Sequence, residues 1–260
     1  MKERIDRSCP WLAGLIALAA GVFYLVGAAE GSIHGYYSPA AVAMSQNLHN
    51  FLYGAVDTAG WSGLDKIPGS LWPQAASVAI FGYSSWSILV PEVLASVATI
   101  VLIYLAVARW LNRPAGVVAA AMYATTPLVA ACAQVNVPES WLALTFALTA
   151  YLAVRAVQSG RLWWLVGAGL AIAAAFQVKM LQGWTIWPAV IIAYLIAAPV
   201  TFWARVWHLL VAGVVSLVAS LWWVLLVTFT PASDRPWVGG TDYNSPWEMV
   251  FGYNGLGRFG

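Results

Sequence analysis

The feature that most constrains this chain is a succession of long apolar segments. A helix needs about 20 mostly apolar residues to cross the roughly 30 Å of hydrocarbon in a bilayer, and seven segments approach that length. They are residues 10–29, 87–108, 115–133, 139–157, 162–178, 183–200 and 206–229. Only 8% of the 260 residues are charged, against about 25% in soluble domains. The sequence therefore predicts an all-α polytopic membrane protein with about seven transmembrane helices.

Lysine and arginine residues predict the orientation, because cytoplasmic loops of membrane proteins retain positive charge. With a cytoplasmic N-terminus and an uncleaved first helix, eight of the 12 basic residues lie on the cytoplasmic side. They are Lys2, Arg4, Arg7, Arg109, Arg113, Arg155, Arg161 and Arg205. We expect a multi-pass protein of the inner or plasma membrane.

The acidic residues follow the opposite distribution. With a cytoplasmic N-terminus, eight of the ten acidic residues lie at or beyond the outer face. They are Glu30, Asp57, Asp65, Glu92, Glu139, Asp234, Asp242 and Glu248. Acidic groups contribute little to topology, so their concentration on one side needs another reason. We expect an extracytoplasmic active face.

A large polar loop, residues 30–86, separates the first two apolar segments. Residues 39–52 and 72–81 carry apolar side chains at helical spacing, which predicts two short interfacial helices. Residues 54–69 between them are rich in glycine and favour turns. The predicted organisation is a transmembrane module over residues 1–229 that includes this loop, followed by a polar extracytoplasmic tail over residues 230–260.

Composition and spacing also exclude several classes of function. The basic residues are spread over the loops and form no patch for a nucleic acid. Cys9 and Cys132 fall on opposite faces of the predicted topology, and no Cys or His spacing typical of a metal site occurs. We therefore predict no metal site of this kind. The scattered carboxylates are compatible with a divalent cation but do not require one.

Two clusters in the outer loop contain residue types suited to catalysis. Glu30 and His34 precede Tyr36-Tyr37 at the outer end of the first segment, where an aromatic anchor at the membrane interface is the structural alternative. Asp65-Lys66 lies further along the loop. A lysine oriented by a neighbouring carboxylate is a good ligand for a lipid phosphate, although the same residues also suit a solvated turn.

Three further clusters fall on the same predicted face. Asn136 and Glu139 precede the fourth segment, where helix capping is the alternative. Lys179 and Gln182 interrupt two apolar runs and suit a phosphate or a sugar hydroxyl, although a lysine at this boundary can simply extend to the membrane surface. The tail contains Asp242 and Asn244 among tryptophans and glycines, a composition that suits a sugar because hydroxyls need polar partners and the ring needs an aromatic face.

The order of these elements resembles a known family. Similar runs occur in the lipid-phosphate-sugar-dependent glycosyltransferases of the GT-C superfamily, in the bacterial mannosyltransferase-like branch related to protein mannosyltransferases and aminoarabinose transferases. The matching residues are Tyr36-Tyr37, Met44-Ser45, His49-Asn50, Asp65-Lys66, the run 176–182 (FQVKMLQ), the run 231–233 (PAS), Arg235-Pro236 and the run 252–258 (GYNGLGR). The resemblance extends over nearly the whole chain from Gly35, and the last run is the most specific.

The resemblance implies a polyprenyl-phosphate sugar, mannose-like, as the donor and an inverting transfer to an unidentified acceptor at the outer face. Lys66 would contact the donor phosphate, and Glu139 stands at the second acidic position of the family. Family members continue beyond this length, so we expect a fragment, a subunit that acts with a second one, or a shortened homologue.

The chain also departs from the family pattern. Ile33-His34-Gly35 stands where the superfamily usually has an acidic residue, and Ile67-Pro68 replaces a double proline. The candidates for the proton acceptor are thus Glu30 and Asp57, ranked above Asp65 and His34. Lys66 beside Asp65 should keep that carboxyl acidic, and the use of His34 would depart from the family.

Two other classes of function remain as alternatives. A non-catalytic membrane subunit that binds lipid or assists assembly would explain the missing acidic residue. A small-solute transporter is a third interpretation, but transporters place polar groups near the middle of the bilayer, whereas those of this chain lie at the outer ends of the segments.

Overall fold

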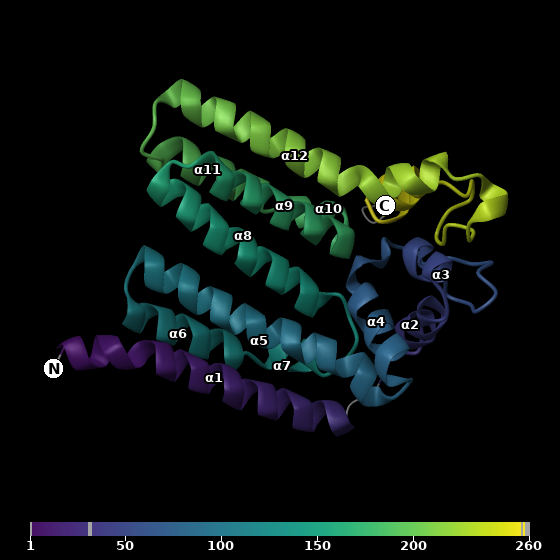
Figure 1. Ribbon diagram of the computed structural model, residues 1–260, viewed down its shortest axis with the longest axis horizontal. Helices are drawn as coiled ribbons and strands as arrows, with labels where there is room; N and C mark the ends of the chain where they lie inside the picture. The colour runs from purple at the N-terminus through teal and green to yellow at the C-terminus, as the bar shows by residue number, and fades with distance from the viewer. Residues whose placement is uncertain (1, 31–32, 256, 258–260) are drawn as a thin grey trace.

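A computed structural model describes residues 2–30, 33–255 and 257 of the chain. These residues form helices and connecting loops, and the described part of the chain contains only two isolated β-bridges, Ala55 with Gly63 and Ser62 with Trp237. The helices α1 (Lys2–Glu30), α5 (Ser85–Trp110), α8 (Glu139–Ser159), α9 (Leu162–Lys179) and α12 (Phe202–Phe229) run along the long axis of the molecule (Figure 1). The all-α polytopic membrane fold is therefore confirmed.

The number of continuous spans is lower than predicted. Five helices of the described chain are long and apolar enough to cross a membrane, and a sixth span results if α6 (Arg113–Ala124) and α7 (Pro127–Ala133) form one bent span. The predicted sixth segment, 183–200, consists of two shorter helices, α10 (Leu181–Trp184) and α11 (Trp187–Ala197). At 11 residues, α11 is shorter than the hydrocarbon thickness requires.

Proline residues explain both interruptions. Pro127 has no backbone N–H and keeps Thr126 in an extended conformation, and α7 leaves α6 at 63°. Pro188 at the start of α11 likewise ends the hydrogen bonding that would continue α10. A preceding change of direction occurs at Met180, a non-glycine residue with a positive φ of 46°.

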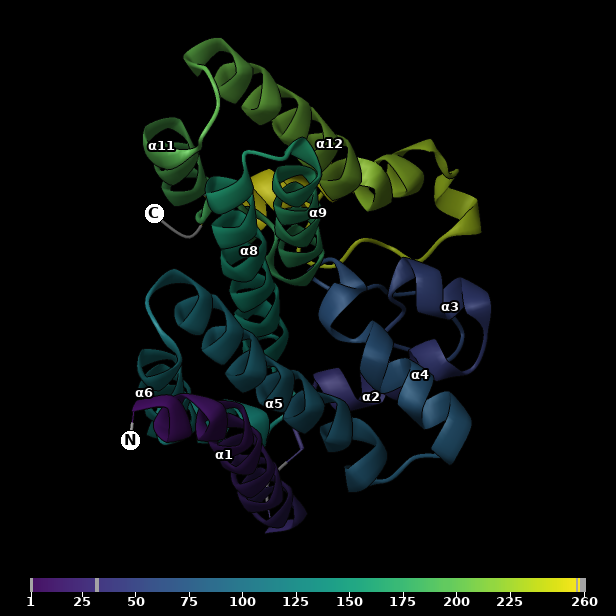
Figure 2. The same ribbon diagram turned by 60° about the vertical axis from the view of Figure 1, so that its left-hand side comes forward.

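The helices alternate in direction, so the connections gather at two ends of the bundle. Figures 1 and 2 show the outer loop, with α2 (Tyr37–Ser45), α3 (Leu48–Tyr53) and α4 (Trp72–Phe81), at the same end as the tail that follows α12. The N-terminus and the turn between α8 and α9 lie at the opposite end. The fold thus brings residues near 60 and residues near 240 into one layer.

The outer loop has three helices where two were predicted. The predicted helix 72–81 coincides with α4, whereas the predicted helix 39–52 is divided into α2 and α3. The division occurs at Asn47, whose extended backbone and side-chain oxygen, which accepts the Asn50 N–H, form the N-cap of α3. Gly54 ends α3 with a left-handed conformation, φ 72°, that glycine adopts without strain.

The loop is anchored to the bundle by close backbone packing. The 3₁₀ turn η1 (Pro68–Ser70) lies against the end of α9, and a Cβ on Gly69 would be only 2.3 Å from the Gln177 carbonyl oxygen. Ile67, beside the turn, is fully buried in a cluster with Phe176 and Trp223. This packing places the loop segment that contains Lys66 next to the segment that contains Lys179.

Arg235 organises the first part of the tail. Its guanidinium donates hydrogen bonds to the Thr230 carbonyl (3.2 Å) and to both the side chain (2.7 Å) and the carbonyl (3.0 Å) of Asn244. The tail also pairs with the loop, since the Gly63 N–H donates to the Trp237 carbonyl at 2.7 Å. The tail is therefore a packed layer over the loop.

Candidate active site

Lys66 lies at the centre of a cluster that the sequence predicted in part. Its Nζ donates a hydrogen bond to the Tyr37 hydroxyl, lies 4.7 Å from the centre of the Tyr37 ring and is 3.5 Å from Asp65 Oδ1. The Lys66 side chain is 12% exposed, so it is largely buried in this cluster. The structure thus brings the predicted residues Tyr37, Asp65 and Lys66 together.

Tyr36 contacts the same cluster from the other side. The Asp65 backbone N–H donates to the Tyr36 hydroxyl at 3.3 Å. Burial, and then the negative charge of Asp65, raise the pKa of Tyr36 to about 12. The phenol therefore keeps its proton at neutral pH and can donate a hydrogen bond to a ligand.

His34 is held by its backbone and by its ring. Its N–H donates to Asn136 Oδ1 at 2.7 Å, and its ring stacks on Tyr37 with 4.3 Å between ring centres. Nδ1 accepts the backbone N–H groups of Tyr36 and Tyr37. A neutral imidazole with an accepting Nδ1 carries its proton on Nε2, so Nε2 of His34 is a donor.

The tail, whose Met249 and Val250 pack against α9 and α12, completes the cluster from a third part of the chain. The Tyr253 hydroxyl donates to Asp65 Oδ2 at 3.5 Å, and the Asn254 amide donates to the Asp65 carbonyl at 2.6 Å. Both residues lie about 190 positions after Asp65 in the chain. They belong to the run that carried the most specific resemblance, although the sequence alone gave no reason to place them beside Asp65.

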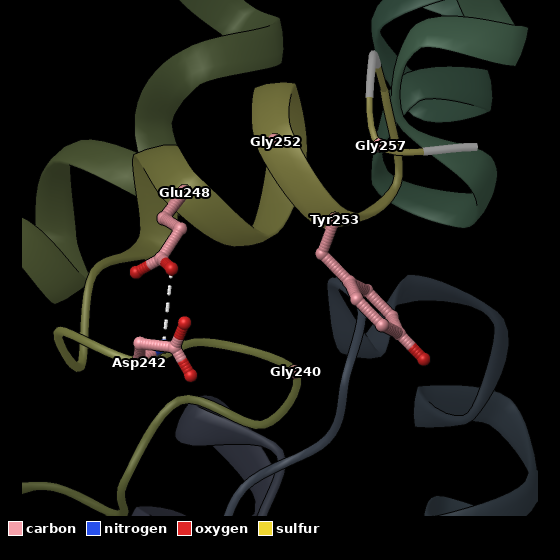
Figure 3. Close-up of a pocket in the computed structure, with 6 residues that line it drawn as sticks. All are labelled: Gly240, Asp242, Glu248, Gly252, Tyr253 and Gly257. Carbon is pink, nitrogen blue, oxygen red and sulfur yellow. Dashed lines mark hydrogen bonds between the residues drawn. The ribbon is translucent and has the colours of Figure 1, made fainter. Parts of the chain in front are cut away.

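A cavity of about 730 Å³ opens beside Tyr253 in the tail. Its lining comprises Gly240, Asp242, Glu248, Gly252, Tyr253 and Gly257 (Figure 3). The Glu248 carboxylate accepts the backbone N–H groups of Asp242 (3.0 Å) and Tyr243 (3.1 Å) and so fixes this wall. Gly240, at φ 71°, has no room for a Cβ, which would lie 2.8 Å from the Tyr253 ring. Hydroxyl-rich ligands suit such a mixture of carboxylates and aromatic surface.

Of the two predicted tail residues, Asp242 lines this cavity and Asn244 does not. Asn244 Oδ1 accepts from Arg235 (2.7 Å) and from the Val238 N–H (2.9 Å). Both contacts lie within the tail, so the observed contacts of Asn244 are structural.

Lys179 and Glu139 form a separate ion pair at the same end of the bundle. Lys179 Nζ lies 2.8 Å from Glu139 Oε1, with side chains 26% and 42% exposed. Gln182 follows Lys179 by three residues and is exposed. Its backbone carbonyl accepts a hydrogen bond from the Thr185 hydroxyl at 2.7 Å. A phosphate that approached Lys179 would share the ammonium with Glu139.

The other two predicted proton acceptors are placed differently. Asp57 caps a turn, where its carboxylate accepts the N–H groups of Ser62 (2.7 Å) and Trp61 (3.2 Å). The Ser62 N–H is the main cause of a lowered pKa of Asp57, which makes this carboxylate a weaker base. Glu30 is the last residue of α1, and its side chain lies outside the described part of the structure.

A second polar cluster joins Asn136, which the sequence predicted as part of the site, to Gln74 and Glu92, which it did not. Asn136, which is fully buried, also donates to Ser38 (3.1 Å) and to Gln74 Oε1 (3.4 Å). Gln74 in turn contacts Glu92. Glu92, which the sequence predicted at or beyond the outer face, has a side chain that is 0% exposed. Within the described ranges, no group of three or more His, Cys, Asp and Glu residues could hold a metal ion.

A family model described as dolichyl-phosphate-mannose-protein mannosyltransferase matches residues 65–223, which is more than half of the chain. The chain belongs to this family. The matched range begins at Asp65 and includes Lys66, Asn136, Glu139 and Lys179.

Individual relatives extend the family match over the rest of the chain. The chain is 36% and 37% identical, over 229 residues each, to two Bacillus subtilis (strain 168) proteins named "Putative mannosyltransferase YkcB" and "Putative mannosyltransferase YycA". These matches cover 88% of the chain but 32% and 33% of the relatives. A third relative is the undecaprenyl phosphate-alpha-4-amino-4-deoxy-L-arabinose arabinosyl transferase of Pseudomonas paraeruginosa. The chain is 25% identical to it, and the match covers 98% of the chain and 45% of that relative. The chain spans about a third of the length of the first two relatives.

Proposed function

We propose that this chain carries the donor site and the proton acceptor of a membrane glycosyltransferase that uses a polyprenyl-phosphate sugar. The observation that carries the proposal is the cluster of Lys66, Asp65, Tyr37 and Tyr253, which joins loop and tail beside a cavity. Family membership and the undecaprenyl phosphate named for one relative support a lipid-linked donor. Transfer takes place at the extracytoplasmic face, as the distribution of basic residues predicts.

Lys66 neutralises the donor phosphate in this mechanism. The ammonium is already oriented by Tyr37 and Asp65, so it loses little side-chain freedom when a phosphate binds. The protonated Tyr36 donates a further hydrogen bond. As the bond between the anomeric carbon and the phosphate oxygen breaks, negative charge grows on the leaving lipid phosphate, and fixed positive charge stabilises it.

Asp65 is the proton acceptor that the contacts favour. An acceptor hydroxyl that enters through the tail cavity gives its proton to the Asp65 carboxylate as its oxygen attacks the anomeric carbon from the side opposite the phosphate. One base suffices for such a one-step inversion. The Asp57 carboxylate already accepts N–H groups of its own turn, and Nδ1 of His34 already accepts two backbone N–H groups, which leaves Nε2 as a donor. Lys179 and Gln182 contribute to donor binding at the edge of the site.

The test is donor consumption by the purified protein in vesicles that contain polyprenyl-phosphate mannose with a radiolabelled sugar, with and without a cell-envelope extract as a source of acceptor. We expect Asp65→Asn and Lys66→Met to lower the rate at least about 100-fold. Asp57→Asn is the matched control and should keep most of the activity. Unchanged turnover in the first two variants, or a wild type that binds the donor and never consumes it, contradicts the proposal; the second result favours a lipid-binding subunit.

A further inference from the structure

Glu92 is a carboxyl group buried inside a membrane-spanning helix. It lies in the second turn of α5, and its side chain is 0% exposed. Ionisable side chains within spans are costly and usually functional. The proposed transfer reaction gives Glu92 no direct role, because the groups around it leave no room for a substrate.

Five successive contacts connect Glu92 to Lys66. Gln74 Nε2 donates to Glu92 Oε1 at 2.7 Å, and Gln74 Oε1 accepts from Asn136 at 3.4 Å. Asn136 accepts the His34 N–H at 2.7 Å, and the His34 ring stacks on Tyr37, which holds Lys66. On the other side, the Trp141 indole donates to Glu92 Oε1 at 3.0 Å. Trp141 is two residues after Glu139 on α8.

The direction of these hydrogen bonds is fixed by groups that can only donate. The His34 backbone N–H is a donor, so the Asn136 atom that it contacts is the oxygen and the Asn136 amide nitrogen faces Gln74. Gln74 therefore presents its oxygen to Asn136 and its nitrogen to Glu92. The Trp141 indole is also a donor only. Oε1 of Glu92 thus accepts twice, and a proton on this carboxyl would reside on Oε2.

The surroundings of Glu92 disfavour its ionised form. The polar groups around it are neutral: the Gln74 amide and the Trp141 indole donate to Oε1, the Ser140 hydroxyl also interacts with the carboxyl, and Oε2 has no hydrogen-bond partner in the described ranges. The described ion pairs do not include Glu92, and the charged group that faces it from α8, Glu139, is negative. An uncompensated buried carboxylate is costly enough that such groups take up a proton.

We infer that Glu92 is a protonated positioning residue, which orients the loop cluster around Lys66 relative to α8 by accepting hydrogen bonds from Gln74 and Trp141 while it remains uncharged. This inference rests on the proposed function, in which Lys66 binds the donor phosphate. A glutamine at position 92 keeps the accepting oxygen and the neutral state, whereas an alanine leaves two buried donors unpaired.

The experiment compares Glu92→Gln and Glu92→Ala in the full chain, with Thr99→Val as the matched control. Thr99 is a buried polar residue of the same helix whose hydroxyl donates to its own helix, to the Ala95 carbonyl. We expect donor consumption within about twofold of wild type for Glu92→Gln and Thr99→Val, and a loss of at least about tenfold for Glu92→Ala, expressed mainly as a raised KM for the donor.

Two readouts do not require transfer activity. The infrared C=O band of a protonated carboxylic acid should be present in the wild type and absent from Glu92→Gln. Acylation of Lys66 by an amine-reactive probe, followed by mass spectrometry, should be slow in wild type and Glu92→Gln and several-fold faster in Glu92→Ala, because the contacts that hold Tyr37 are lost. If no variant consumes donor, these measurements still decide the inference about Glu92, whereas the proposed function fails.

Several results would overturn the inference. Glu92→Gln as impaired as Glu92→Ala would mean that the charge of the carboxylate is needed. The absence of the carboxylic acid band from the infrared spectrum of the wild type would show directly that Glu92 is ionised. If Glu92→Ala does not fold, the infrared comparison of wild type with Glu92→Gln remains decisive. Wild-type labelling and wild-type turnover in a folded Glu92→Ala would show that Glu92 positions nothing.

Discussion

The Tyr253 hydroxyl donates a hydrogen bond to Asp65 Oδ2 across a separation of 188 residues. The same carboxylate faces Lys66 through Oδ1 at 3.5 Å. The tail therefore contacts the carboxylate that we propose as proton acceptor, at the oxygen that the lysine leaves free. A hydrogen bond to an ionised group is stronger than one between neutral groups. Loss of the hydrogen bond from Tyr253 to Asp65 should therefore affect catalysis.

We expect Tyr253→Phe to lower the rate of donor consumption about three- to tenfold with little change in the KM for the donor, because the phenol orients Asp65 and does not touch the phosphate. Steady-state kinetics in vesicles separate the two parameters. Tyr243→Phe is the control, since Tyr243 lies in the same tail and its side chain is 85% exposed. A raised KM with an unchanged maximal rate would place Tyr253 in donor binding instead.

The ion pair of Lys179 and Glu139 can be tested by exchange of its charges. Each single variant, Lys179→Glu or Glu139→Lys, should lower stability by no more than about 1 kcal/mol, because the pair is partly exposed. The double variant should restore thermal stability. The double variant should not restore donor affinity, because a phosphate needs the cation at position 179. We expect affinity for the donor to be about tenfold weaker than in the wild type both in Lys179→Glu and in the double variant. Restored affinity in the exchange would show that the pair is only structural.

The sequence predicted the helices better than their interruptions. The apolar spacing of residues 72–81 predicted α4 with its observed bounds, because a short amphipathic helix depends mainly on local pattern. The segment 115–133 is apolar throughout, so hydrophobicity alone could not show the 63° bend at Thr126 and Pro127. Pro127 was the available local signal.

The contacts within the site were predictable only where the residues are neighbours in the chain. Asp65 and Lys66 are adjacent, and the tyrosine pair lies in the same loop, so their pattern indicated a phosphate site. Tyr253 reaches Asp65 only through the tertiary fold. Glu92 was assigned to the outer face only from its place in the predicted topology, near the outer end of the second apolar segment. In the structure, Gln74 and Trp141 donate hydrogen bonds to the Glu92 carboxyl group, and both residues lie outside α5.

The turn around Asp57 should depend on pH. Backbone N–H groups, chiefly that of Ser62, lower the pKa of Asp57 in the folded protein. A lowered folded-state pKa stabilises the fold at pH values above the ordinary pKa of the group, and this contribution is lost as the pH falls through the folded-state pKa. Asp57→Ala should therefore speed proteolysis of the loop a few-fold at about pH 7 and by a smaller factor at about pH 3. An equal effect at both values would contradict a role for the charge.

Gly69 offers the sharpest test of how the loop is anchored. A Cβ at this position would lie 2.3 Å from the Gln177 carbonyl oxygen, a backbone atom of α9 that cannot move aside. Gly69→Ala should therefore displace the segment that contains Lys66, cost about 1–3 kcal/mol and lower both the melting temperature and the rate of donor consumption. Differential scanning fluorimetry in detergent and the vesicle assay measure the two effects.

Gly35→Ala is the matched control for that substitution. Gly35 lies in the same loop, has no neighbouring atom within 4 Å of a Cβ position and shows no positive φ. The added methyl group should thus leave stability and turnover unchanged, or stabilise slightly by restricting the unfolded chain. If Gly69→Ala behaved like Gly35→Ala, the loop would not be held against α9 by this contact. The proximity of Lys66 and Lys179 would then need another cause.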